Sequence, residues 1–469
     1  MFSKKTIRYY YWLTQAFIQK HLKYILLSFL LSIVFIFILL SLSPIIQQSL
    51  LTEKQIKGVV GKYTLNEIPE EITSKISSGL IFVNEKGELR PGLASSWKFN
   101  KNGKEYEFTL RDNLYWNDGK EFTAADVNYS FKDVEKKVIN NKTVIFQLKQ
   151  SLPIFATYLK RPIIKYPSNI SKSKASGSLL MGVAGLYSVQ DVRIEYGYVK
   201  EMTLIPNKTG LPLLVYKFYD EEGDLAVAYK KGEIREMQLT RYSLAKDFET
   251  WKNSTVQQSV DYTRLMTLFF NMNNPLWKNA QDKEVRQALR ESIDISKFNQ
   301  TGVEAIGSIS PLSWAYNPDL KRNTYNPESA MAVLKKLKDA STSAELNFRT
   351  AYENFGVADE IVNEFKNVGL KVNLSFISGG GPGNFDFFLV YWKLPTDPDQ
   401  YFFWHQKQKN RGNVSGYDRP KIDKLLEDGR NTTSIEERKK IYYEFQRTLL
   451  DDPPAVFLFY PYVYTIKRK

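Results

Sequence analysis

Residues 116–127 read WNDGKEFTAADV, a stretch that joins a tight turn to the start of a helix. Asp118-Gly119 is a typical turn pair, because glycine adopts the left-handed backbone conformation without a steric penalty. Thr123 stands three residues before Asp126, which is the spacing of a threonine cap at a helix N-terminus. The pattern therefore predicts a turn followed by a helix over residues 123–137.

The flanking residues predict a set of strands. Apolar positions alternate over residues 97–100 and 106–110, which is typical of a β-hairpin with one buried face. Further elements are expected on both sides of this hairpin: a helix at 69–78 and strands at 80–83, 186–189, 202–205 and 214–219.

Strand and helix patterns alternate in the second half of the chain. Such alternation is typical of parallel α/β layers, in which helices cover the faces of a sheet. The expected strands are 265–271, 346–350, 371–375 and 387–391, and the expected helices are 283–292, 327–338 and 357–368.

The composition indicates a large globular protein and excludes several kinds of site. The chain has 469 residues, of which 43% are hydrophobic, and domains of about 100–200 residues predict two or three packed units. There is no cysteine and there are two histidines, so disulfides, thiolate metal sites and histidine-rich metal sites are excluded. The net charge of +14 is dispersed, without the clustered arginines of nucleic-acid-binding proteins. We therefore expect no metal, no cofactor and no nucleic-acid partner.

A membrane anchor is expected at residues 24–42, which carry no charge and approach the roughly 20 apolar residues that cross a bilayer as a helix. The preceding 23 residues contain five basic residues and no acid. The positive-inside rule therefore places this flank in the cytoplasm and everything after Leu42 outside. The alternative is a cleaved signal peptide, whose apolar part is shorter and ends at a small-x-small site. Pro44 is expected to end the helix, and residues 43–60 to form a stalk.

Several motifs resemble the family 5 extracellular solute-binding proteins, which are the oligopeptide-, dipeptide- and nickel-binding components of ABC importers. Residues 89–97, LRPGLASSW, resemble the family's pxLAxSW segment, and residues 116–127 resemble its W-x-D-G-x-x-F-T-A-x-D-V. The resemblance covers roughly Tyr63 to Tyr464. Weaker similarities follow in the family's order at residues 182–187, 282–294, 325–330, 413–426 and 437–456.

The resemblance implies an α/β fold of two lobes, the type II periplasmic-binding-protein fold, with an extra subdomain in the first lobe. The one N-terminal transmembrane helix expected from residues 24–42 precedes this fold. Ligand would be enclosed between lobes that close about a hinge. The expected segments are a basic cytoplasmic segment 1–23, the anchor 24–42, the stalk 43–60, lobe 1 with its subdomain 61–262, lobe 2 263–454, and a strand 455–469 that returns to lobe 1.

The resemblance also implies a set of ligand-binding residues in lobe 2. In peptide-binding members a tryptophan at the end of a strand packs over the ligand and an asparagine meets its backbone. The corresponding residues here are Trp392 and Asn413. The alternative for Trp392 is packing in the core. Tyr391, Lys393 and Tyr417 lie beside them in sequence and complete the expected site.

One position departs from the family pattern. The family's W-x-x-D-x-x-D-P places an aspartate against the peptide α-ammonium, whereas residues 392–398 read WKLPTDP, with Pro395 at that position. A buried ammonium needs a carboxylate partner. Either Asp397 takes this role, or the ligand has no free N-terminus and Lys393 receives an anionic group. A structural interpretation also stays open, in which Asp397 forms an Asp-Pro turn before a helix.

The expected protein is a bacterial, membrane-anchored, extracytoplasmic receptor that captures peptides for an ABC importer, with the permease subunits as partners. A second hypothesis is a receptor of the same fold that does not serve transport and binds wall peptides, lipid-like molecules or a signalling partner. An enzyme is not expected, because no nucleophile–base arrangement stands out. Adjacent carboxylates such as Glu70-Glu71 are interpreted as solvated faces or turns.

Overall fold

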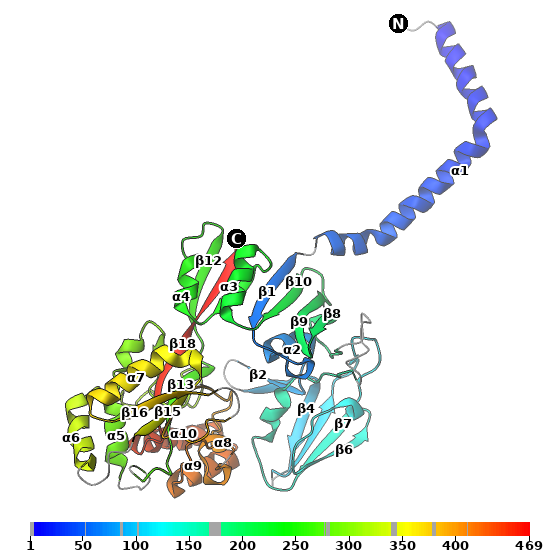
Figure 1. Ribbon diagram of the computed structural model, residues 1–469. Coiled ribbons are helices and arrows are strands. Elements are labelled where there is room, and N and C mark those ends of the chain that lie inside the picture. The colour runs from blue at the N-terminus through cyan, green and yellow to red at the C-terminus, as the bar shows by residue number, and fades with distance from the viewer. Residues whose placement is uncertain are drawn as a thin grey trace.

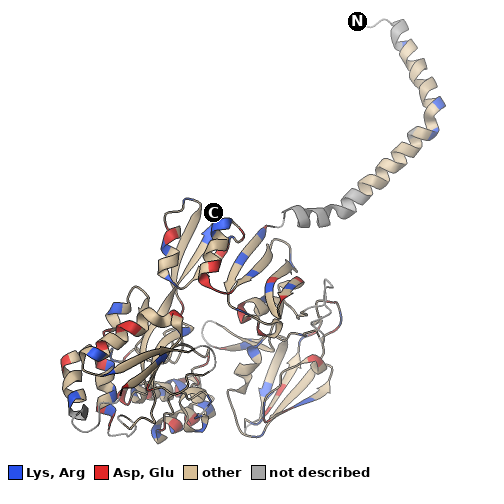
Figure 2. Cartoon of the chain, in the orientation of Figure 1, with Lys and Arg blue, Asp and Glu red and all other residues tan. Residues whose placement is uncertain are grey.

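The computed structural model describes residues 4–51, 53–84, 88–100, 103–167, 180–275, 277, 282–338, 345–377, 381–409 and 411–469. It shows two lobes side by side and a long N-terminal helix that projects away from both (Figure 1). Basic and acidic residues are mixed over the two lobes, whereas few of either colour the part of the N-terminal helix that is not drawn in grey (Figure 2).

The N-terminal helix α1 (Lys4–Leu51) is bent by 57° between residues 8–24 and 26–37. No unbroken helix in the described ranges is long and apolar enough to cross a membrane, although the two arms of this bend meet that requirement together. The expectation that Pro44 ends the helix is wrong, because α1 continues to Leu51. A proline removes one main-chain hydrogen bond, which a long helix can accommodate.

Lobe 1 is built on one end of a large mixed sheet, in which β1 (Lys54–Val60) is parallel to both of its neighbours. The sheet order is β11 (Glu236–Leu239), β1, β10 (Leu213–Tyr219), β9 (Tyr198–Pro206) and β8 (Tyr187–Glu195). The helices of this lobe are α2 (Glu70–Ile76), α3 (Glu222–Lys231) and α4 (Tyr242–Ala245).

The expected stalk is wrong for residues 54–60, because these residues form β1 and pair with β10 along its whole length. The sequence KQIKGVV does not predict a strand, because its lysines interrupt the alternation of apolar residues. Gly58 lies within it close to α3, and a Cβ there would require the side chains of Leu225 and Ile234 to move.

A subdomain of lobe 1 contains a separate four-stranded antiparallel sheet. Its order is β4 (Ala94–Phe99), β5 (Glu105–Leu110), β7 (Thr143–Leu148) and β6 (Val134–Asn140). The predicted hairpin is confirmed by the β4–β5 pairing. The two-stranded sheet of β2 (Ile81–Val83) and β3 (Leu89–Pro91) and the 3-10 turn Phe155–Lys160 pack beside it.

The predicted helix at 123–137 is wrong. Thr123 does cap a helical turn with Asp126, but that turn ends after residues 124–126. Asp133 then adopts a positive φ of 65°, which no α-helix contains. The following VEKKVIN pairs with β7 as strand β6, where β-branched residues are favoured.

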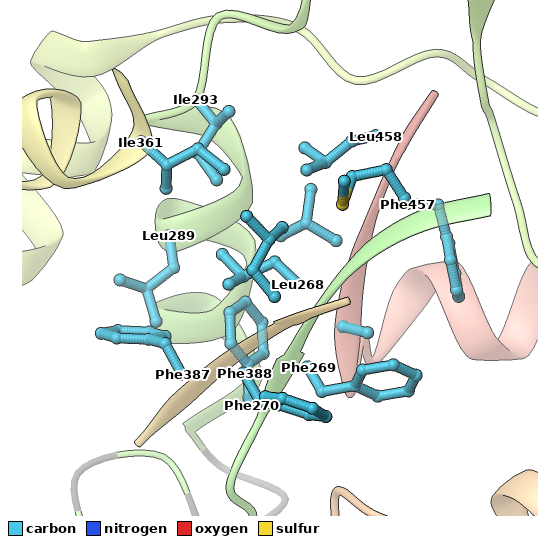
Figure 3. Packing of buried hydrophobic residues seen from close by; sticks show 14 of the residues in the cluster. Leu268, Phe269, Phe270, Leu289, Ile293, Ile361, Phe387, Phe388, Phe457 and Leu458 are labelled. Carbon is cyan, nitrogen blue, oxygen red and sulfur yellow. The ribbon is translucent and has the colours of Figure 1, made fainter. Parts of the chain in front are cut away.

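Lobe 2 is the α/β unit predicted from the alternating pattern. Its strands run in the order β16 (Val372–Phe376), β15 (Leu346–Thr350), β17 (Phe387–Lys393) and β13 (Arg264–Phe270), with β15 parallel to β16 and β17. The expectation of parallel strands is wrong at β13, which is antiparallel to β17. Figure 3 shows Leu268 and Phe387 packing among the aromatic and aliphatic side chains of this core. The helices are α5 (Lys283–Glu291), α6 (Pro327–Lys338), α7 (Phe355–Asn367), α8 (Tyr401–Trp404), α9 (Pro420–Asn431) and α10 (Ile435–Asp451).

Strand β18 (Ala455–Arg468) joins the two lobes. Its first half pairs with β13 and β14 (Gly302–Glu304) of lobe 2. Its second half pairs with β11 and β12 (Ser254–Val260) of lobe 1. One continuous strand therefore belongs to both parts of the sheet, and it links lobe 2 to lobe 1 (Figure 1).

Candidate functional site

Several cavities in the described part of the chain lie between the lobes, and three of them are lined by predicted site residues. The first, of about 1040 Å³, is lined by Glu222 and Arg241 of lobe 1 and by Tyr352 and Tyr391 of lobe 2. The second and third, of about 420 and 980 Å³, lie between lobe 2 and the α2 and subdomain side of lobe 1. Volumes of this size suit small molecules and short chains.

The second and third cavities share one wall. Both are lined by Glu70 and Lys160 of lobe 1 and by Lys393, Leu394 and Thr396 of lobe 2. The shared wall thus contains groups of both charges, and each lobe contributes to it.

The lobes touch at the edge of this shared wall. Lys160 Nζ donates a hydrogen bond to Thr396 Oγ1 at 2.6 Å. The hydroxyl of Tyr158 lies 3.4 Å from Asp399 Oδ2 and accepts from Arg430 at 3.5 Å. Burial raises the pKa of Tyr158 to about 12, so its hydroxyl keeps its proton at neutral pH. These contacts are long or partly exposed, so separating the lobes here disrupts little.

Asp397 lines the second cavity, but its carboxylate is already paired. Arg438 of α10 donates to both oxygens, at 2.7 and 3.2 Å. The arginine is 7% exposed, and it also donates to the carbonyl of Gly429 at 3.0 Å. Burial opposes the charge on Arg438, but Asp397 more than offsets this and raises the pKa of the guanidinium. Asp397 therefore holds α10 against the loop after β17.

Asp399 is paired in the same way. Arg430 of α9 contacts its Oδ2 at 2.8 Å, and the guanidinium lies 4.0 Å from the ring centroid of Tyr401. The Asp399 side chain is 6% exposed. Both aspartates of the loop after β17 are therefore neutralised by arginines from the two helices behind it, and this loop forms a braced wall of the second cavity.

Tyr391 lines the first cavity, and Lys393 lines the second and third. Arg264 stacks 5.5 Å from the Tyr391 ring centroid, and Asp261 binds the Arg264 Nε at 2.7 Å. Burial raises the pKa of Tyr391 to about 12. Lys393 is exposed at the end of β17.

Trp392 points into the core of lobe 2. It is 6% exposed, and its ring meets those of Phe403 and Trp404 edge-on, at centroid distances of 4.8 and 5.4 Å. Its Nε1 is buried without a hydrogen-bond partner in the described part of the chain. The ligand contact expected of Trp392 stays a prediction. In the structure its ring packs in the core beneath the loop that forms the wall of the second cavity.

Asn413 and Tyr417 are also buried, at 2% and 0% exposure. Asn413 Nδ2 donates to the carbonyls of Trp404, His405 and Tyr417, and its Oδ1 accepts from the Tyr417 N–H. The Tyr417 hydroxyl donates to the carbonyl of Asp452 at 2.8 Å. All of these bonds stay within lobe 2, so the ligand roles of both residues stay predictions.

Of the six predicted residues, the structure thus places Tyr391, Lys393 and Asp397 at the cavities, and Trp392, Asn413 and Tyr417 in the packing behind them. Sequence reasoning missed the lobe 1 residues of the shared wall. Glu70 belongs to a pair interpreted as a solvated face or turn, and Lys160 lies in a segment without a recognised motif. No local signal marks either residue, because only the approach of the lobes brings them to the site.

Within the described ranges no three histidine, aspartate or glutamate side chains are grouped so as to hold a metal ion. The buried His405 contacts Glu427 at 3.1 Å and lies beneath the Tyr401 ring, so it takes part in local packing.

Comparison with known proteins extends over most of the chain. A family model for bacterial extracellular solute-binding proteins, family 5 Middle, matches residues 88–413. The oligopeptide-binding protein AppA of Bacillus subtilis is 24% identical over 85% of this chain and 83% of its own length. The periplasmic murein peptide-binding protein MppA of Escherichia coli is 23% identical over 82% of each chain.

Solved structures share the fold. NikZ from Campylobacter jejuni, solved in complex with Ni(L-His), superposes with a TM-score of 0.72 over 89% of this chain and 94% of its own, at 23% identity. AppA from Bacillus subtilis, solved with a nonapeptide, gives a TM-score of 0.70 over 89% and 95%, at 21% identity. The two-lobed α/β architecture predicted from the sequence is confirmed by these structures.

Proposed function

The chain belongs to the bacterial extracellular solute-binding proteins of family 5, and on that premise we propose that it captures a peptide or peptide-like solute between its lobes for an ABC importer. The expected resemblance is confirmed by the match over residues 88–413. Several relatives are named as peptide-binding proteins, and these names support the peptide as the first solute to test.

The observation that carries this proposal is the mixed charge of the interlobe wall. The second and third cavities share a carboxylate, Glu70, and two ammonium groups, Lys160 and Lys393. Peptides are zwitterions with an apolar or polar body, so a site for them needs acceptors for an ammonium and donors for a carboxylate. The apolar side chains of Leu394 and Phe403 lie in the same second cavity.

Capture proceeds by closure of the lobes. A ligand that contacts both walls binds the closed arrangement more tightly than the open one, and this difference shifts the population toward closure. Tyr391, Lys393 and Asp397 are the predicted site residues that line the cavities. We assign them to the ligand-facing wall, and we assign Trp392, Asn413 and Tyr417 to its support.

The N-terminal helix serves as a tether in this proposal. Residues 24–37 carry no charge, and the basic flank before them favours a cytoplasmic N-terminus. The main domain then lies outside the cytoplasmic membrane, where it meets the permease subunits. Deletion of residues 1–42 is expected to move the protein from the membrane fraction to the soluble fraction. Unchanged fractionation of the deleted chain would contradict the tether.

Thermal denaturation with peptides tests the proposed function. A ligand that binds the native state raises the melting temperature by mass action. We expect a pool of random-sequence short peptides to raise the melting temperature of the full chain, kept in mild detergent, in a concentration-dependent manner. A pool that leaves the melting temperature unchanged at millimolar concentration would refute peptide capture.

A second candidate is a receptor of the same fold that does not serve transport. It is favoured by the pairing of Asp397 and Asp399 with Arg438 and Arg430, which leaves neither carboxylate of this loop available for a ligand. Wall peptides, lipid-like molecules and a signalling partner are its possible ligands. Deletion of the cognate permease genes discriminates the two candidates, because only the first predicts loss of peptide uptake. Both candidates are binding functions, and no catalytic activity is proposed.

A further inference from the structure

We propose that Glu70 and Lys393 form two opposed charge subsites, one on each lobe, that select a ligand with both a free ammonium and a free carboxylate. This inference rests on the proposed function and names the ligand class of that same site. It assigns the ammonium to lobe 1 and the carboxylate to lobe 2.

Glu70 lies on the wall that the second and third cavities share. Glu70 opens α2 and is the one carboxylate residue among those that line both the second and the third cavity. It is exposed, and no hydrogen bond or ion pair involves its carboxylate in the described part of the chain. A charged group that no partner neutralises is free to receive an ammonium group from a ligand.

The other carboxylates of these two cavities are already engaged or lie to one side. Asp397 and Asp399 are paired with arginines, and Asp261 accepts from Thr263 and from Arg264. Glu67 accepts from Thr64. A ligand ammonium would have to displace an arginine or a hydroxyl at those positions, whereas it displaces only water at Glu70.

Glu71 is the remaining acid, and it lines the third cavity alone. It follows Glu70 directly in α2 and is likewise exposed. It therefore has the same local sequence and the same charge as Glu70, but it does not reach the shared wall. This difference makes it a matched control.

Lys393 provides the opposite charge. Of the two lysines on the shared wall, Lys160 already donates to Thr396 across the lobes. The Lys393 ammonium takes part in no hydrogen bond or ion pair within the described ranges, and the side chain is exposed at the end of β17. Its main chain is fixed in the sheet by pairing with Arg264 of β13. Lys393 thus presents a free cation from a rigid strand end.

The placement on opposite lobes couples recognition to closure. A zwitterion that spans the wall contacts Glu70 and Lys393 together only when the lobes approach. A ligand that lacks one of its charges makes a charged contact with only one lobe. Its affinities for the open and the closed arrangement then no longer differ enough to drive closure. Selection for two free termini is therefore built into the conformational change.

The test crosses two variants with two ligand modifications. The full chain in mild detergent is titrated with the pool of short peptides, with the same pool after N-acetylation, and with the same pool after C-terminal amidation. For the wild type, each modification is expected to weaken binding about tenfold, the effect of one charged hydrogen bond at a partly exposed site. The Glu70→Gln variant should bind the free pool and the acetylated pool with equal affinity. The Lys393→Gln variant should bind the free pool and the amidated pool with equal affinity.

Two controls accompany the variants. Glu71→Gln and Arg161→Gln each remove a charge from the third cavity alone, and both should keep the full discrimination of the wild type. Melting temperatures without peptide should be unchanged in Glu70→Gln and Lys393→Gln, because neither side chain makes a bond within the described chain.

The outcomes separate this inference from the proposed function. If Glu70→Gln still prefers the free pool to the acetylated pool about tenfold, the assignment of the ammonium to Glu70 is wrong. The same reasoning applies to Lys393→Gln and the amidated pool. If the wild type binds all three pools equally, peptide capture stands and the charge subsites are refuted. If it binds none of them, the proposed function itself fails.

Discussion

Replacing Arg438 with methionine should unfold lobe 2 at a much lower temperature. Methionine keeps most of the side-chain volume but removes the guanidinium that pairs with Asp397 at 2.7 Å and bonds the Gly429 carbonyl at 3.0 Å. The side chain of Arg438 is 8% exposed and that of Asp397 is 18% exposed. The substitution therefore leaves a poorly hydrated carboxylate without its partner.

The magnitude follows from this burial. Removing one partner of a fully buried pair destabilises by about 3–5 kcal/mol. Since Asp397 retains some contact with water, we take about 2 kcal/mol for the orphaned carboxylate and about 1 kcal/mol for the carbonyl of Gly429. In a unit of the size of lobe 2, each kcal/mol lowers the melting temperature by about 2–4 °C. The expected decrease is therefore about 6–12 °C.

The assay is thermal unfolding followed by differential scanning calorimetry, with Arg447→Met as the matched control. Arg447 lies on the same helix α10, but its pair with Asp319 spans 4.0 Å and the two side chains are 55% and 72% exposed. Such a surface pair contributes about 0–1 kcal/mol, so the control should shift the melting temperature by at most about 4 °C. Equal shifts in the two variants would show that the Arg438–Asp397 pair contributes no more to stability than an exposed surface pair. Asp397→Asn combined with Arg438→Met should be less destabilised than the sum of the single changes, because both disrupt one interaction.

Three further predictions use other parts of the molecule. Burial raises the pKa of Glu364, although Lys297 partly opposes this. The protonated Glu364 carboxyl therefore stabilises the folded state fully at pH values below the ordinary pKa of 4.5. This contribution to the free energy of unfolding is lost as the pH rises through the higher pKa of the folded state. The Glu364→Gln variant should accordingly have the same melting temperature as the wild type near pH 4 and a higher melting temperature at neutral pH. Calorimetry that finds the variant less stable than the wild type at neutral pH would contradict this. Gly182→Ala should lower the melting temperature by several degrees, because its Cβ would collide with the carbonyl of Ile76, whereas Gly223→Ala in α3, with open space around it, should leave it unchanged or raise it slightly. Thr396→Val removes the acceptor for Lys160 and should shift the lobes about fivefold toward separation, and an unchanged interlobe distance by fluorescence energy transfer would count against the contact.

Much of the fold was predictable because apolar periodicity reports burial directly. The β4–β5 hairpin and the alternating strands and helices of lobe 2 follow such patterns and are confirmed. The errors have local causes. Residues 123–137 carry a genuine cap, but a cap fixes only where a turn begins, and pairing with β7 makes residues 134–140 a strand. In β1 the lysines conceal a strand whose edges are both covered by neighbours.

The site was less predictable, because it depends on pairs that are distant in sequence. The segment WKLPTDP shows that Asp397 lies in the part of the sequence where a ligand-binding carboxylate is expected. Nothing in that segment shows that Arg438 neutralises this carboxylate. Conversely, Glu70-Glu71 resembles a solvated turn until the loop after β17 is placed opposite it. Local sequence indicates which residues can carry charge, whereas the approach of the lobes determines which charges remain available to a ligand.

Strand β18 has a consequence for how the protein is made. It is synthesised after β11, β12, β13 and β14, the strands with which it pairs in both lobes. Neither lobe can complete its sheet while the ribosome is still adding earlier residues, and pairings so distant in sequence form slowly. The two lobes of the nascent polypeptide therefore stay without their finished sheet until β18 is available. An unfolded chain is the form that a secretion channel can thread, so the order of these strands delays the finished fold of both lobes until β18 has been made.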